Sequence, residues 1–205
     1  MLVAFESLIH LSIAVLLIVG AYQFYFLPQR RPFRRSIKFH LNKIDHAIPF
    51  VPQWVWVYSG LYYPVILYLV LTVDSFKRFN YTTFNFIILL VIQLTFFYLF
   101  PVETPKEWRS LSKSDSISNR FLSFVQKFDS RQNCFPSMHV SVATLTAFHL
   151  QQNLSLAIGT WSNLAFAFPL LIGLSTLFTK QHYLIDIPAG FLLGWFCYYL
   201  FLLYW

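Results

Sequence analysis

A histidine and an aspartate stand four residues apart near the end of the chain, at His182 and Asp186. On a helix this spacing puts both side chains on one face. The carboxylate can then hold one ring nitrogen while the other stays free to attack an electrophile, as in a catalytic triad. The pair therefore predicts a nucleophilic histidine at position 182, oriented by Asp186.

A second histidine follows a typical helix start, Pro136-Ser137-Met138-His139. A serine at or near a helix N-cap, with free backbone N–H groups behind it and the positive end of the helix dipole, is an anion site. His139 would lie one turn inside that helix. An anion is therefore expected at Ser137.

The distance between the two motifs matches a membrane protein. The 43 residues from His139 to His182 are about what one helix across a bilayer and one helix back consume. Both histidines would then return to the same face. Ionisable groups at membrane depth are costly unless they are paired or functional, so a functional site is favoured over polar packing.

The elements that position these residues are apolar helices. The chain has 205 residues, of which 57% are hydrophobic and only 11% are charged, too few for a soluble domain. Stretches of about 20 apolar residues cross a hydrocarbon core as helices. Six such stretches occur, at 7–27, 54–73, 82–102, 138–151, 157–178 and 184–205.

These stretches predict an all-α, polytopic integral membrane protein: six transmembrane helices in one bundle, forming a single domain over residues 1–205 with the motifs in 100–190. The first stretch lacks a signal-peptide cleavage signature and is expected to remain as a span. Polar residues in 138–151 predict a helix buried inside the bundle. Gly190 and Gly194 would let another helix approach closely.

Basic residues gather in the segments 28–53, 103–137 and 179–183, which share one face if the spans alternate in direction. They are Arg30, Arg31, Arg34, Arg35, Lys38, Lys43, Lys106, Arg109, Lys113, Arg120, Lys127, Arg131 and Lys180. The positive-inside rule would make this face cytoplasmic, whereas a phosphate site also attracts cations, so the orientation stays open. The net charge of +7 lies in short loops, which excludes a nucleic-acid surface and leaves membrane lipids as neighbours.

The C-terminal half resembles the type 2 phosphatidic acid phosphatase (PAP2) superfamily. That family's second motif, Pro-Ser-Gly-His, is matched from Pro136 to His139, with Met138 in place of glycine. Its third motif is Ser-Arg, five residues, His, three residues and Asp. Ser175, His182 and Asp186 fit it, with threonine in place of arginine.

The resemblance implies a six-helix bundle and a phosphohistidine mechanism that uses no metal and no cofactor. In that mechanism His182 attacks phosphorus and Asp186 orients it. His139 protonates the leaving oxygen and then activates water or another acceptor. Ser137 and Ser175 belong to the matched motifs and are expected at the phosphate.

The family's first motif, Lys, six residues and Arg-Pro, is not intact. Arg31-Pro32 offers the dipeptide a full hairpin too early, with Phe24 where lysine is required. After the third span, Lys106 and Arg109 are candidates for binding phosphate at altered spacing. Lys180 either replaces the cation missing from the third motif or is a solvated loop lysine.

Two features resemble the inositol phosphorylceramide synthase-like branch of the superfamily: Thr176 in the third motif and the segment from Asp45 to Pro52. A simpler interpretation of that segment is a break before a helix. The nearby aromatic residues would then include an interfacial belt: Trp54, Trp56, Tyr58, Tyr62 and Tyr63.

Three functions remain open. The first is a lipid phosphatase that hydrolyses a lipid phosphate monoester or pyrophosphate. The second is a lipid phosphotransferase that passes the phosphoryl group or phospho-headgroup to an alcohol. The third is a non-catalytic transporter or membrane subunit, in which the histidines form a proton or metal path; zinc is disfavoured because no compact ligand cluster exists. The oligomeric state stays open, and Cys134 is expected to report the membrane side of the site by thiol labelling.

Overall fold

The computed structural model describes residues 2–30, 34–39, 43–111, 115–129 and 131–204. Within these ranges the chain is helical, and the β-structure consists of one isolated bridge between Ile37 and Val102. The predicted all-α membrane fold is confirmed. Arg31, Pro32 and Lys113 lie outside the described residues.

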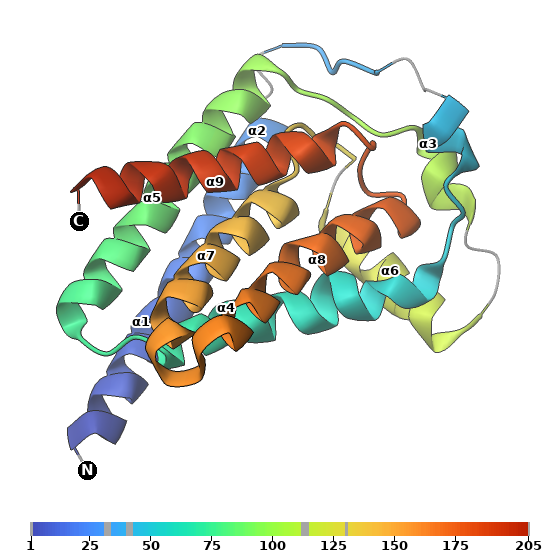
Figure 1. Ribbon diagram of the computed structural model, residues 1–205. Helices are drawn as coiled ribbons and strands as arrows, with labels where there is room; N and C mark the ends of the chain where they lie inside the picture. Colours follow the sequence, from blue (N-terminus) through green and yellow to red (C-terminus); the bar gives the residue numbers. More distant parts are fainter. Residues whose placement is uncertain (1, 31–33, 40–42, 112–114, 130, 205) are drawn as a thin grey trace.

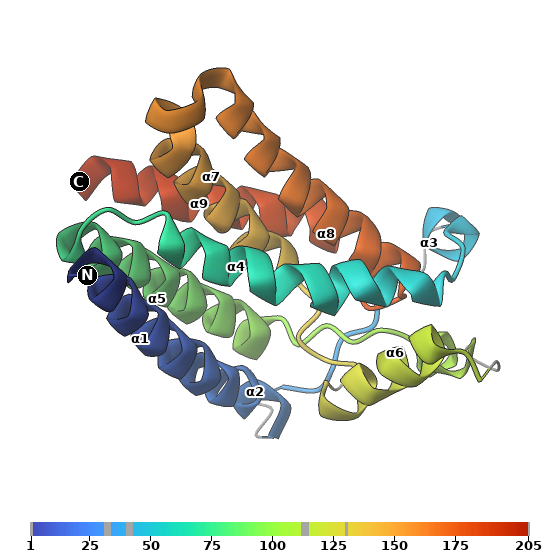
Figure 2. The same ribbon diagram turned by 90° about the horizontal axis from the view of Figure 1, so that it is seen from below.

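The helices run in chain order as α1 (Leu2–Tyr25), α2 (Leu27–Arg30), α3 (Lys43–Ala47), η1 (Pro52–Trp54), η2 (Trp56–Leu61), α4 (Tyr62–Leu71), α5 (Phe76–Leu99), η3 (Lys106–Leu111), α6 (Ile117–Phe128), α7 (Met138–Ile158), η4 (Gly159–Phe166), α8 (Ala167–Phe178) and α9 (Asp186–Tyr204). The long helices form one bundle, with both ends of the chain at one side and the short helices α3 and α6 at the other (Figures 1 and 2).

Five stretches among the described residues are long and apolar enough to cross a membrane: Leu8–Arg30, Pro52–Leu71, Phe76–Leu99, Met138–Phe178 and Asp186–Leu203. The sequence predicted six. The difference lies in the fourth stretch, whose 41 residues join the two spans expected at 138–151 and 157–178. The chain reverses its direction at η4, and α8 packs back against α7 (Figure 2). Helical residues therefore cover both expected stretches, with no non-helical residue between them.

The loops that the sequence places on one face do meet. The Glu103 N–H donates to the Ile37 carbonyl oxygen at 3.0 Å, which joins the first loop segment to the second. The Lys180 ammonium donates a hydrogen bond to the Asp45 carbonyl oxygen at 2.7 Å, which joins the third segment to the first. On the opposite face the Asn153 amide donates to the Thr72 hydroxyl at 3.0 Å. Spans of alternating direction explain both sets of contacts.

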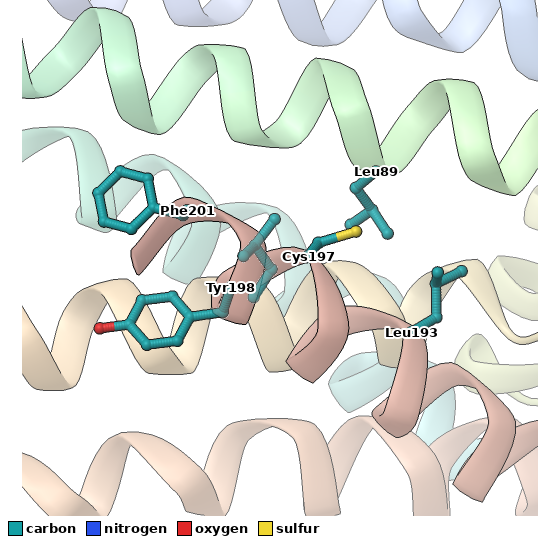
Figure 3. Close-up of a cluster of buried hydrophobic side chains, with 6 residues drawn as sticks. Leu89, Leu193, Cys197, Tyr198 and Phe201 are labelled. Carbon is teal, nitrogen blue, oxygen red and sulfur yellow. The ribbon is translucent and has the colours of Figure 1, made fainter. Parts of the chain in front are cut away.

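The last helix closes the bundle against α5 and α7. Figure 3 shows part of the buried cluster that joins them, whose members are Leu89, Leu145, Leu193, Cys197, Tyr198 and Phe201. Both cysteines, Cys134 and Cys197, are buried and free. The polar residues of α7 are also buried, including Ser141, Thr144 and His149, which confirms the prediction for this helix.

Close contact between α7 and α9 depends on two glycines. A Cβ atom at Gly190 would lie 2.6 Å from the Ser137 carbonyl oxygen, and one at Gly194 would overlap the Ser141 carbonyl oxygen and the Thr144 Cβ. The predicted close approach at these glycines is therefore confirmed. This contact holds the beginning of α7 beside the beginning of α9.

Gly194→Ala is expected to destabilise the protein by about 1–3 kcal/mol, because the added methyl group has no room and the two helices must separate. Thermal unfolding in detergent measures the change. Gly20→Ala is the matched control, since a Cβ there meets no atom within 4 Å. It should be neutral or slightly stabilising. Equal behaviour of the two variants would contradict the packing role of Gly194.

Candidate active site

The predicted histidine–aspartate pair is formed. The Nδ1 atom of His182 lies 3.1 Å from Oδ2 of Asp186 and 2.9 Å from the carbonyl oxygen of Cys134. Both partners are acceptors when the carboxyl is ionised, so Nδ1 carries the hydrogen and the lone pair of the neutral ring lies on Nε2. No described residue hydrogen-bonds to Nε2. The nitrogen that would attack is left free.

The reason for this pairing differs from the one given by the sequence. His182 lies in a bend between α8 and α9, not on a helix, and Asp186 is the first residue of α9. A turn brings them together, in which the Asp186 N–H donates to the Tyr183 carbonyl. The Tyr183 N–H in turn donates to Asp186 Oδ2 at 2.8 Å. Asp186 is fully buried, and its Oδ2 atom contacts both the His182 ring and the Tyr183 N–H.

The second motif meets the third at the beginnings of two helices, α7 and α9. Ser137 is the N-cap of α7, where its hydroxyl accepts from the Val140 N–H. Its own N–H donates to the Asp186 carbonyl oxygen at 3.1 Å. The rings of His139 and His182 then lie 6.2 Å apart between centroids, nearly perpendicular. The structure brings these four residues together, as the spacing predicts.

His139 is held by two tyrosines that the sequence assigned to an interfacial belt. The Tyr58 ring stacks on it at 4.3 Å, and the Tyr62 ring lies 4.9 Å away. Both tyrosines are buried, with 2% and 7% of their surface exposed, so the belt interpretation is wrong for them. No described residue hydrogen-bonds to the ring nitrogens of His139. They remain available for proton transfer.

Arg109 and Lys106 differ in their surroundings. One terminal nitrogen of Arg109 donates to the carbonyl oxygens of Gln126 and Asp129, at 2.9 and 2.6 Å, and fixes the end of α6. Its other terminal nitrogen has no described partner. Burial lowers the pKa of the guanidinium, and the neighbouring Asp129 opposes this shift. Lys106 is exposed at the start of η3. Arg109 is thus the better placed of the two to hold an anion.

Lys180 and Ser175 make structural contacts. Lys180 adopts a left-handed backbone with φ of 57°, and its ammonium lies 4.9 Å from the Trp108 ring centre as well as on the Asp45 carbonyl. Burial lowers its pKa, which Asp45 opposes. The Ser175 hydroxyl donates to the Ile172 carbonyl within α8. Substrate binding by these residues stays a prediction.

Asp45 fixes the loop that carries His182. Its carboxylate accepts from the Leu184 N–H at 2.8 Å, and its carbonyl accepts from Lys180. The sequence pointed to the segment from Asp45 to Pro52 only through its resemblance to one branch. Asp45 lies in the short helix α3, and no local pattern in the sequence predicts its contact with Leu184.

Gln93 of α5 positions the other half of the site. Its amide nitrogen donates to the Pro136 carbonyl at 2.8 Å, and its amide oxygen accepts from the Ser141 hydroxyl at 2.9 Å. The side chain is completely buried. A lone glutamine in an apolar span was the available signal, because polar side chains there are retained for pairing.

Gln93→Leu is expected to lower stability by about 1–3 kcal/mol, since it leaves the Pro136 carbonyl buried without a donor. We also expect slower turnover, because the loop before His139 loses its support. Thermal unfolding and initial rates measure the two effects. Thr95→Val is the matched control: Thr95 is exposed on the same helix and donates only to the Val91 carbonyl of its own helix. Unchanged stability of Gln93→Leu would disprove this role.

A cavity of about 450 Å³ opens beside His139. Its walls come from α1, from η2 and α4, and from α5, with Asp129 and His139 among its few polar residues. This volume lies in the range of ligand pockets, about 300–1,000 Å³. A ligand in the cavity would therefore touch the second histidine.

Cys134 is not the reporter that the sequence suggested. It is buried, and burial raises the pKa of its thiol well above the ordinary value. Thiol reagents require an accessible thiolate, so the labelling prediction is wrong. Its carbonyl, which orients His182, is the part of this residue that serves the site.

An oriented histidine with a free nitrogen, a second histidine and an anion-binding helix start are suited to phosphoryl transfer. No group of three or more histidine, cysteine, aspartate or glutamate residues suited to a metal ion occurs in the described part of the chain. The fold is that of a helical membrane protein, and its site has these three features.

The model of the PAP2 superfamily matches residues 35–200, which is most of the chain. The protein belongs to the PAP2 superfamily, as the two motifs predicted. Membership supports a phosphatase-type enzyme that acts on lipid phosphoesters in general. Comparisons with curated proteins and with solved structures gave no match.

Proposed function

We propose that this protein is a multi-pass membrane lipid phosphatase that hydrolyses a lipid phosphate monoester or pyrophosphate through a phosphohistidine. The arrangement of His182 carries the proposal. Its Nδ1 is held by Asp186 and the Cys134 carbonyl, its Nε2 is free, and the ring of His139 lies 6.2 Å away. An oriented nucleophile beside an acid–base group is what a two-step transfer requires.

In the first step Nε2 of His182 attacks phosphorus, and the bond from phosphorus to the lipid oxygen breaks. Asp186 stabilises the positive charge that develops on the ring, and His139 donates a proton to the leaving oxygen. In the second step His139 takes a proton from a water molecule, whose oxygen attacks phosphorus. The bond to His182 breaks, and inorganic phosphate leaves.

The phosphoryl oxygens need positive partners during both steps. The N–H groups at the start of α7, capped by Ser137, supply one set. Arg109 supplies a charged donor through the terminal nitrogen that no described residue occupies. Lys106 in η3, Ser175 in α8 and Lys180 just after α8 complete the proposed binding residues.

The test is phosphate release by purified protein in detergent, with excess chelator, from a panel of lipid phosphates. Wild type should release phosphate from at least one of them, and His182→Ala should not. Release that requires an added metal ion would overturn the mechanism. No release from any member by wild type would overturn hydrolysis and leave the second candidate.

That second candidate is a lipid phosphotransferase, and the cavity beside His139 is the observation in its favour. A lipid alcohol lying there would reach the histidine that activates the acceptor. Added alcohol would then suppress free phosphate and yield a phosphorylated alcohol. Phosphate release that is unaffected by alcohols would exclude this candidate.

A further inference from the structure

The cavity beside His139 has an apolar body and one polar end. The body lies between α1, α4 and α5 and is lined by aliphatic and aromatic side chains, such as Leu17, Ile66 and Leu90. The polar end contains Tyr25, Tyr58, Asp129 and His139. Because the body lies between three apolar stretches suited to a bilayer, a hydrocarbon chain is the chemistry that fits it. The reacting end of such a molecule would lie at His139.

Asp129 is unusual at this polar end, because a carboxylate repels the phosphate of a substrate. Its Oδ1 atom accepts from the Tyr25 hydroxyl at 2.8 Å and from the Gln29 amide at 3.4 Å. No described residue donates to Oδ2. Burial raises the pKa of this carboxyl, while the Tyr25 hydrogen bond and Arg109 oppose the shift.

Oδ2 is thus an acceptor that no described residue occupies, on a residue that lines the cavity, and a ligand there can supply the donor. We propose that Asp129 Oδ2 accepts a hydrogen bond from a hydroxyl, amide N–H or ammonium group next to the phosphate ester of the lipid. The hydrocarbon chain of the same lipid occupies the cavity. The enzyme thereby selects lipids that bear such a donor. This inference rests on the proposed function of the site.

Lipids without the donor are disfavoured for a physical reason. A plain alkyl or isoprenoid phosphate would cover Oδ2 and remove its water without replacing the hydrogen bond. An ester carbonyl at that position would place an acceptor against an acceptor. Sites built to hydrogen-bond a substrate group reject analogues that lack it much more strongly than apolar pockets reject a missing methylene.

The test compares two substrates that differ by one group: a single-chain alkyl glycerol 3-phosphate with a free 2-hydroxyl, and its 2-deoxy analogue. Wild type should show a kcat/KM about 10- to 100-fold higher for the hydroxyl substrate, the range for a hydrogen bond to a charged group. Asp129→Ala should bring this ratio close to one, mainly by losing activity on the hydroxyl substrate. Asp115→Asn is the carboxylate control, since Asp115 is exposed and paired with Arg120; it should keep the ratio.

Asp129→Asn covers the possibility that the alanine variant does not fold. It keeps the shape of the side chain and an acceptor for Tyr25 but removes the negative charge, so a neutral hydrogen bond replaces a charged one and the ratio should fall part of the way towards one. Equal wild-type rates on the two substrates, or a ratio that both variants preserve, would overturn the inference. Failure of the proposed function is distinguishable, because wild type would then release phosphate from neither substrate.

Discussion

His182→Ala is expected to lower phosphate release by about 10,000-fold or more, because it removes the attacking atom and not merely one of its supports. Stability should change little by comparison. The side chain is buried at the end of the bundle, but its hydrogen bonds run to a loop carbonyl and to Asp186, which keeps the Tyr183 N–H as a donor.

The measurement is rapid acid–base quenching with a radiolabelled lipid phosphate. Wild type should show a protein-bound phosphate that is labile in acid and stable in base, as expected for phosphorus bound to nitrogen, and the variant should show none. His46→Ala is the matched control, since His46 is an exposed histidine on α3 at the same end of the bundle. A variant that kept a tenth of the wild-type rate would show that His182 is not the nucleophile.

The architecture and the centre of the site were predictable because their signals are local. Apolar stretches long enough for a bilayer leave the backbone no alternative to helices. Given membrane-spanning helices, the 43 residues from His139 to His182 predict that both lie at one end of the bundle. The four-residue spacing to Asp186 gave the correct pair, although a turn achieves what the helix argument assumed.

The supports of the site were not predictable, because each depends on a contact between distant segments. Tyr58 fits an interfacial belt by composition, and only the packing of η2 against α7 places it on His139. Gln93 and Asp45 hold loops that lie 43 and 139 residues away along the chain. A single sequence contains no pattern that links such positions.

The count of spans shows the same limit. Hydrophobicity detected 138–151 and 157–178 as separate stretches, since polar residues lie between them. The structure continues the helix through Gln152 and Asn153 to Ile158 and then turns in η4. Asn153 is satisfied there by the Thr72 hydroxyl. The expected loop is therefore the last turns of α7, and its Asn153 side chain is paired with the residue that caps the end of α4.

His139→Asn is expected to lower phosphate release by about 100- to 10,000-fold, the usual contribution of a general acid–base group. The loss should depend on the leaving group. A lipid alkoxide needs a proton from His139 in order to leave, whereas an aryl oxide leaves without one. The first step should therefore approach the wild-type rate when an aryl phosphate replaces the lipid phosphate.

The second step should stay slow with every substrate, because water is always its nucleophile and needs His139 to accept its proton. With an aryl phosphate the variant should thus release one equivalent of phenol in a burst and accumulate phosphohistidine. A radiolabel bound to the protein would measure this directly. His46→Asn should show neither burst nor accumulation. If His139→Asn lost equal activity on both leaving groups and stayed unlabelled, His139 would serve to position the substrate. The proton would then come from another group at the polar end of the cavity, where Tyr25, Tyr58 and Asp129 are the other polar residues.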